Sequence, residues 1–414
     1  MYGSITLSTI RCQERNQPIN KSGFRSLISG VVPLFMVAHF SHHLVTALPV
    51  PLLPFIRDEF GLDYTRAGFV IAAFSITYGI FQLPAGWLAD RIGARTLIII
   101  SIVGVGIAGI LIGLSQNYWM LLLFLVLIGV LGGGYHPAST TLIAVSVEPK
   151  NLGRALGFHM VGGSASYFLV PLIAAALAAI WGWRGSFIGL AIPTIAFGVV
   201  LYMFPRRLAP TKKIEPETTG SYVRAPYPPS RWRRLITILA LGTLTQAVLM
   251  SVIPFIPIFL VDNFNVGKEV AAASISLVFA MGLWSNPVGG YLSDRLGSIA
   301  MIMITLFLAG PVIYLFNLVP YGAGTSALLI IFGIILYVNT TVAQVYIAGQ
   351  APERHRSTMF GIYFCGAMEG AGVLTPAIGY LIDQFGFHTS FTIIGATLLT
   401  TAFIGALILW FNRD

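Results

Sequence analysis

Charged residues are scarce in this chain. Only 9% of its 414 residues are Asp, Glu, Lys or Arg, whereas a soluble domain carries about 25%. Apolar residues make up 56% of the chain, and a water-soluble globule of that composition would expose far too much apolar surface. The composition therefore excludes a soluble fold and predicts a protein embedded in a lipid bilayer.

Cysteine is almost absent as well. Cys12 lies in a polar N-terminal stretch and Cys365 inside a late apolar run, so the two are not expected to pair, and neither belongs to a metal-ligand pattern. The chain also lacks a Walker A phosphate-binding string and room for a nucleotide-binding domain. Neither a cofactor nor direct use of ATP is expected.

Long apolar runs fill the rest of the sequence. A helix needs about 20 apolar residues to cross the hydrocarbon core, and twelve runs of about this length can be counted. Helix is the only structure that satisfies the backbone of such runs in lipid. We therefore expect an all-α membrane protein with twelve transmembrane helices.

A short motif occurs twice and divides the chain. The first copy is Gly86-Trp-Leu-Ala-Asp-Arg-Ile-Gly93, and the second is Gly290-Tyr-Leu-Ser-Asp-Arg-Leu-Gly297, 204 residues later. Half-chain repeats indicate two similar bundles. Because each half is a set of membrane spans, we expect the functional site to lie between the two halves.

The net charge of +9 does not indicate nucleic-acid binding, because the basic residues sit in short gaps between apolar runs. If alternate loops are assigned to opposite sides, 20 Lys and Arg residues fall on the side of both termini and 4 on the other. The positive-inside rule makes the first side cytoplasmic.

These observations predict the organisation of the chain. A cytoplasmic N-terminal tail covers 1–27, and six-helix bundles cover 28–204 and 234–411. A basic, proline-rich cytoplasmic linker covers 205–233, and a cytoplasmic tail covers 412–414.

Twelve spans in two halves, the linker and the repeated Gly-x-Leu-x-Asp-Arg-x-Gly motif resemble the major facilitator superfamily. Within it, Gly134-Tyr-His-Pro-Ala138 resembles the fosmidomycin-resistance-like exporters. The resemblance implies a monomeric secondary transporter of the plasma (inner) membrane, in which the two bundles rock about a central site.

The repeated motif carries charged residues at the ends of two spans. In the family resembled, such residues form a conformational latch, here Asp90, Arg91, Arg95, Asp294 and Arg295. The plainer interpretation is membrane anchoring by positive charge and a tight turn.

Glu369 is the only one of 15 carboxylates placed deep within an apolar run. Ionisable groups in hydrocarbon are costly and usually functional, so Glu369 is a candidate proton carrier. The alternative is a neutral carboxyl group that hydrogen-bonds to a neighbouring helix.

Five histidines also fall within predicted spans. His39 and His43 share one helix face, and His136 lies on a span that also lines the cavity in the family resembled. We expect His39 and His43 to assist proton coupling and His136 to line the substrate cavity. No metal is expected, because no carboxylate accompanies them and the spacing matches no dedicated motif. Hydrogen bonding to helix backbone is the structural alternative.

Amide side chains occupy the corresponding spans of the second half. Gln246, Asn339 and Gln344 are candidates to contact substrate, and Gln246 is the repeat partner of His42. Polar residues of this kind also serve simply to join helices.

The sequence therefore predicts a secondary active transporter of a small organic solute, with protons and the bilayer as its other partners. Efflux of a drug or organic anion is favoured, and uptake of a small organic acid is the nearest alternative. A ligand sensor that transports nothing is a second class. An intramembrane enzyme is a third, but no complete catalytic group is evident.

Overall fold

A computed structural model describes residues 32–147, 151–203, 228–352 and 355–411. These residues form helices and short connections. The helices are α2 (Val32–Thr46), α3 (Pro49–Phe60), α4 (Tyr64–Ile92), α5 (Ala94–Gly113), α6 (Tyr118–Gly132), α7 (Tyr135–Ser146), α8 (Leu152–Met203), α9 (Pro229–Val252), α10 (Phe255–Phe264), α11 (Lys268–Ala280), α12 (Gly282–Leu296), α13 (Ser298–Leu315), α14 (Ala323–Gln350) and α15 (Arg356–Phe411).

Within the described residues, ten helical stretches are long and apolar enough to span a membrane. Two of them, within α8 and α15, exceed 50 residues, which is more than twice the length of one crossing. Each bends sharply at a glycine with positive φ, Gly182 at 69° and Gly386 at 71°. Each therefore supplies two spans, and the all-α fold with twelve spans is confirmed.

Several spans are interrupted near their middle. Span one consists of α2 and α3, which meet where Pro49 begins the second helix. Span four consists of α6 and α7, which meet at the Gly134–Ala138 motif. Proline suits the first turn of a helix because it has no N–H to leave unpaired.

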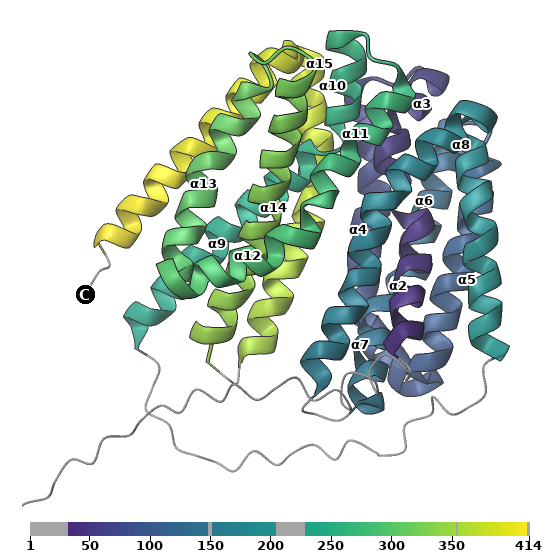
Figure 1. The fold of residues 1–414 in the computed structure, drawn as a ribbon, viewed down its shortest axis with the longest axis horizontal. Coiled ribbons are helices and arrows are strands. Elements are labelled where there is room, and N and C mark those ends of the chain that lie inside the picture. Colours follow the sequence, from purple (N-terminus) through teal and green to yellow (C-terminus); the bar gives the residue numbers. More distant parts are fainter. Residues whose placement is uncertain (1–31, 148–150, 204–227, 353–354, 412–414) are drawn as a thin grey trace, which may run out of the picture.

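The helices form two groups of six spans, α2–α8 and α9–α15 (Figure 1). The end at which α8 stops at Met203 and α9 starts at Pro229 is here called the linker end. The opposite end, with α3 and α10, is called the distal end. The two groups converge at the distal end, at the top of Figure 1, and diverge toward the linker end.

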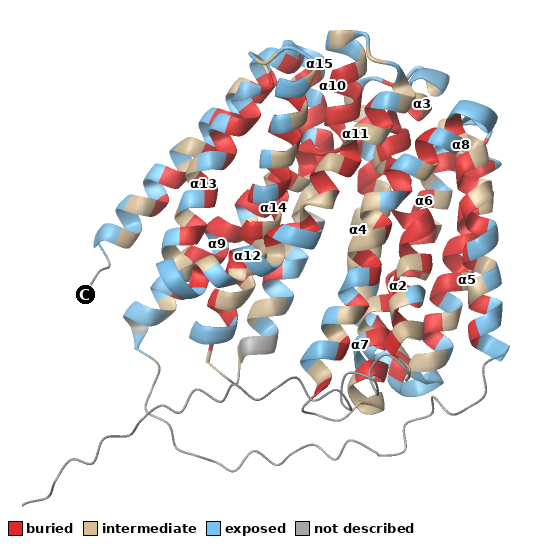
Figure 2. Cartoon of the chain, viewed as in Figure 1, coloured by how far each residue is buried: buried red, intermediate tan, exposed pale blue. Residues whose placement is uncertain are grey.

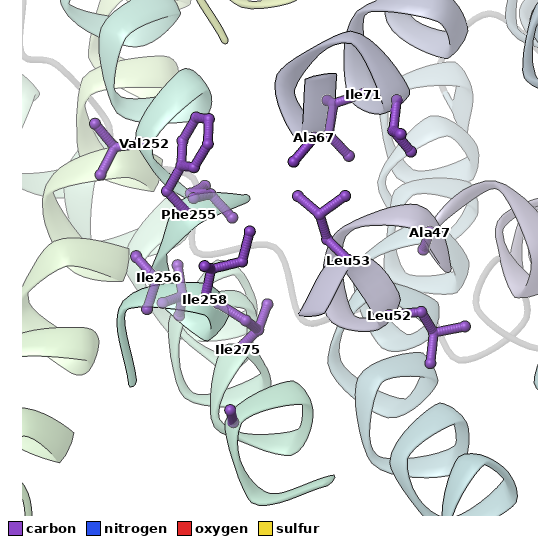
Figure 3. Packing of buried hydrophobic residues seen from close by; sticks show 14 of the residues in the cluster. Ala47, Leu52, Leu53, Ala67, Ile71, Val252, Phe255, Ile256, Ile258 and Ile275 are labelled. Carbon is purple, nitrogen blue, oxygen red and sulfur yellow. The ribbon is translucent and has the colours of Figure 1, made fainter. Parts of the chain in front are cut away.

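An apolar core joins the groups at the distal end. Buried side chains of α3 and α4, including Leu53 and Ile71, belong to the same cluster as Phe255 and Ile256 of α10 (Figure 3). Elsewhere, many residues along the outside of both groups are exposed (Figure 2). They include large apolar residues, as expected for surfaces that face lipid tails.

Inside the first bundle, α2 packs closely on α8 at two glycines. A Cβ on Gly162 would lie 2.0 Å from the carbonyl oxygen of Met36, and one on Gly163 would lie 2.5 Å from the His39 ring. Only glycine permits so close an approach between helices. This contact fixes the position of the histidines on α2.

We predict that Gly162→Ala lowers the thermal stability of the protein in detergent, because overpacking of this kind costs about 1–3 kcal/mol. Gly157→Ala is the matched control, since a Cβ there meets nothing within 4 Å and alanine favours the helix by about 0.5–1 kcal/mol. Melting curves that showed Gly162→Ala as stable as Gly157→Ala would contradict the described packing.

Candidate functional site

Five histidine side chains gather inside the first bundle. His39, His42 and His43 project from α2, His136 from α7 and His159 from α8. All but His136 are at most 4% exposed, and His136 is half-buried. The structure thus brings His136 against the span-one pair, with ring centroids 5.1 Å from His39 and 5.6 Å from His43.

Hydrogen bonds fix the orientation of these rings. Nδ1 of His39 lies 2.8 Å from the carbonyl oxygen of His159, and Nδ1 of His159 lies 3.1 Å from that of Phe35. Because a carbonyl only accepts, both Nδ1 atoms donate. His43 contacts Thr46 Oγ1 through Nδ1 at 2.9 Å and His39 Nε2 through its own Nε2 at 3.2 Å.

Tyrosines surround the histidines. Nε2 of His42 lies 3.1 Å from the hydroxyl of Tyr78, and its ring stacks on Tyr135 at 4.3 Å. Two buried atoms of this cluster, His42 Nδ1 and the Tyr135 hydroxyl, have no hydrogen-bond partner among the described residues. Tyr167 packs on His43 at 4.7 Å and on Phe279 of α11 at 5.3 Å. Tyr167 thereby connects the cluster to the second bundle.

The second bundle has amides at the corresponding depth. Asn339 donates through Nδ2 to Gln246 Oε1 at 3.1 Å and to the carbonyl of Gly242 at 3.2 Å, while Thr305 donates to Asn339 Oδ1 at 3.3 Å. Gln246 and Asn339 are 1% and 0% exposed. Gln344 lies later on α14, half-buried, and is not part of this group.

Glu369 belongs to α15, but its side chain lies outside the described residues. Its role as a proton carrier therefore stays a prediction from the sequence.

Polar bonds join the bundles at the distal end. Arg57 pairs with Asp262 at 2.5 Å, and the Tyr64 hydroxyl donates to the same carboxylate at 2.6 Å. Lys268 pairs with Asp58 at 2.5 Å. These bonds, with those of Asp383 below, are here called the distal clamp.

Asp383 of α15 completes the distal clamp by capping the start of α4. Its two carboxylate oxygens accept from the backbone N–H groups of Tyr64 and Thr65 at 2.8 Å, and one also accepts from Thr65 Oγ1 at 2.5 Å. A carboxylate at a helix N-terminus satisfies otherwise unpaired donors and interacts favourably with the helix dipole. Here the cap comes from the opposite bundle.

The distal clamp was not anticipated from the sequence, although the repeat contains a signal for part of it. Asp58 and Asp262 are repeat partners, and so are Tyr64 and Lys268. Asp58 binds Lys268, and Asp262 binds Tyr64. The two contacts are therefore related by exchange of the halves.

The predicted latch residues lie at the linker end, and the contacts that the described residues show for them are made within one bundle. Arg91 stacks on Trp87 at 4.1 Å and Arg295 on Tyr291 at 4.7 Å, while Asp90 and Asp294 are exposed. Arg95 donates to the carbonyl of Tyr202 at 2.9 Å, within its own bundle. Between pairs of described residues, the hydrogen bonds and ion pairs that join the bundles all lie at the distal end.

Both motif copies nevertheless adopt the same turn. Gly93 and Gly297 close the motif with φ of 89° and 86°, values that favour glycine. The two copies of the motif are therefore alike in backbone conformation as well as in sequence.

Two six-span bundles, joined at one end and bearing buried polar groups, define the architecture of a membrane transporter. The Major Facilitator Superfamily profile matches residues 35–337 and 238–414, and the chain belongs to that family.

Among curated proteins, the chain is similar to multidrug resistance protein MdtG of Proteus mirabilis, 31% identical over 66% of this chain and 68% of that protein. It is also similar to the "Probable sulfoacetate transporter SauU" of Cupriavidus necator, 24% identical over 93% and 94%. The cis,cis-muconate transport protein of Acinetobacter baylyi is 27% identical over 85% and 87%.

Among solved structures, the fold resembles a bacterial homologue of the human lysosomal transporter Spinster in an inward-facing and occupied conformation. The TM-score is 0.78 at 16% identity, over 92% of this chain and 96% of that one. With the family and these relatives, the chain is a multi-pass membrane protein and a secondary transporter of a small molecule.

We predict that Asp383→Asn weakens closure of the distal end, because a hydrogen bond to a charged group contributes about 1.5–3 kcal/mol. Spin labels on Gln116→Cys and Asn263→Cys, in a background with Cys12 and Cys365 replaced by serine, should report a longer and broader distance distribution. Asp63→Asn, which changes an α4 cap within one bundle, should leave the distribution unchanged. An unaltered distribution for Asp383→Asn would argue against the clamp.

Proposed function

We propose that the protein is a proton-driven secondary transporter that exports small organic anions across the inner membrane. The observation that carries the proposal is the one-sided distal clamp. Alternating access proceeds by rocking of one bundle against the other about a central site, so a state open at one end is closed at the other. Bonds between described residues join the bundles only at the distal end.

The orientation in the membrane follows from charge. The linker end adjoins the loops that carry most Lys and Arg residues of the chain, so we assign it to the cytoplasm. In that orientation the described state is closed toward the outside and corresponds to an inward-facing transporter.

The substrate class is inferred from relatives and from the site together. The names of two relatives specify organic anions, sulfoacetate and muconate, and that of a third specifies multidrug resistance. In their protonated form, the imidazoles of the histidine cluster would donate hydrogen bonds to an anionic headgroup. Tyr167, packed between His43 and Phe279, would transmit occupancy of that site to the second bundle.

Export is the favoured direction because MdtG is a multidrug resistance protein and because Gly134–Ala138 resembles the fosmidomycin-resistance-like exporters. Uptake of an organic acid is the second candidate. It stays a candidate because the sulfoacetate and muconate relatives, which match more of the chain than MdtG does, have names that specify transport without a direction.

Proton coupling is assigned to Glu369. It stands alone among the carboxylates in being placed deep within a span, where an ionisable group is rarely kept without a function. Protonation and release of this carboxyl during each cycle would couple transport to the proton gradient. His39 and His43 are the other candidates for proton coupling from the sequence. The arrangement of their nitrogen atoms suits a metal cation instead.

We predict that Glu369→Gln abolishes the stimulation of transport by a pH gradient in proteoliposomes. Sulfoacetate and muconate would serve as radiolabelled probes, with the gradient imposed in either direction to separate export from uptake. Glu269→Gln is the matched control, because Glu269 lies at the distal end in the first turn of α11. If Glu369→Gln is still stimulated by the pH gradient, the assignment of proton coupling to Glu369 is wrong. If the wild type transports neither probe, the proposed substrate class is wrong.

A further inference from the structure

Three of the clustered histidines present nitrogen atoms to a common point. One nitrogen from each of His39, His43 and His136 lies within 4.8 Å of the other two. The residues come from α2 and α7, which are far apart in sequence. Spacing along the chain therefore does not reveal the group.

The backbone carbonyl of His159 determines which ring nitrogen of His39 carries the proton. Nδ1 of His39 donates to the carbonyl oxygen of His159, so in the neutral ring Nε2 carries the free lone pair. This Nε2 faces Nε2 of His43 at 3.2 Å. A backbone carbonyl that holds the outer nitrogen of a histidine is the usual support for a metal-binding ring.

Thr46 controls the second ring. Its hydroxyl has two neighbours in reach, the carbonyl oxygen of His42 at 3.2 Å and Nδ1 of His43 at 2.9 Å. When the hydroxyl donates to the carbonyl, it accepts from Nδ1 of His43, and Nε2 of His43 then carries a lone pair as well. Two lone pairs then face each other across 3.2 Å, an arrangement that a cation between them would stabilise.

That separation matches two ligands of one metal ion. Zn–N bonds of about 2.0–2.1 Å at a tetrahedral angle place neighbouring nitrogens about 3.3 Å apart. We propose that His39, His43 and His136 bind a divalent first-row transition metal ion, for which Zn²⁺ is the probe. A rotation of the half-buried His136 ring would be needed to bring its nitrogen, now within 4.8 Å of the other two, to the same separation.

The ligand set selects the class of metal. Imidazole suits Zn²⁺, Cu²⁺, Ni²⁺ and Co²⁺, whereas Mg²⁺ and Ca²⁺ require oxygen ligands. Three histidines leave a fourth position open. His136 is the least enclosed of the three, so the open position lies on its side, where water or an anion would complete the coordination.

Metal binding is tested on the purified full-length protein, isolated without a polyhistidine tag. Equilibrium dialysis with elemental analysis should find one Zn²⁺ per chain, and Zn²⁺ should raise the melting temperature. His43→Gln and His136→Gln should each weaken binding by more than about 10-fold, the low end for loss of an outer-shell partner. His388→Gln, which removes an exposed imidazole at the distal end, should bind as the wild type does.

Two further measurements keep the proposal testable if a variant folds poorly. Thr46→Val keeps the side-chain shape but removes the support of His43, and it should weaken Zn²⁺ binding by about 10-fold. Co²⁺ should give intense visible bands of a four- or five-coordinate site in the wild type and lose them in His136→Gln. Absence of stoichiometric binding, or equal binding by His388→Gln and every cluster variant, would overturn the proposal. None of these readouts requires transport, so failure of the proposed function leaves them interpretable.

Discussion

A polar side chain inside a lipid-embedded bundle has no bulk water to bind, so it must find its partners on neighbouring helices. This constraint accounts for most of the features that distinguish the two bundles. The first bundle places imidazoles at its polar centre, where they contact one another and donate to backbone carbonyls of α2 and α8. The second does so with an amide network around Asn339. The two bundles therefore share a fold but differ in chemistry, because imidazoles can titrate or bind a cation and amides cannot titrate.

Close packing also determines where the histidines lie. Because Gly163 has no side chain, the His39 ring can lie against α8, where a Cβ would be 2.5 Å from the ring. The unpartnered His42 Nδ1 and Tyr135 hydroxyl lie in the same cluster. A buried polar atom without a partner costs about 1–3 kcal/mol, and such a cost is commonly borne at sites that bind something. The polar centre of the first bundle is therefore the natural place for a ligand or ion.

Much of the fold could be predicted from the sequence because the rules involved are local. Length and hydropathy define the spans, and the repeated motif reveals the two halves. To predict that His136 lies close to His39 and His43, one must also know which spans face the central cavity. The distal clamp could not be found in this way. Asp383 is one acidic residue near the end of a span, and neither spacing nor charge shows that it caps a helix that begins 319 residues earlier, at Tyr64.

The reciprocal contacts at the distal end are nearly symmetric between the two halves. Asp58 with Lys268, and Asp262 with Tyr64, are the contacts that a two-fold homodimer of one bundle would make, each formed twice by the same pair of positions. In a dimer, one codon change alters both copies of the contact. In a single chain each half can change alone, and here Lys268 stands where its counterpart in the first half is Tyr64. One chain therefore allows the two sides of a symmetric contact to be adjusted separately.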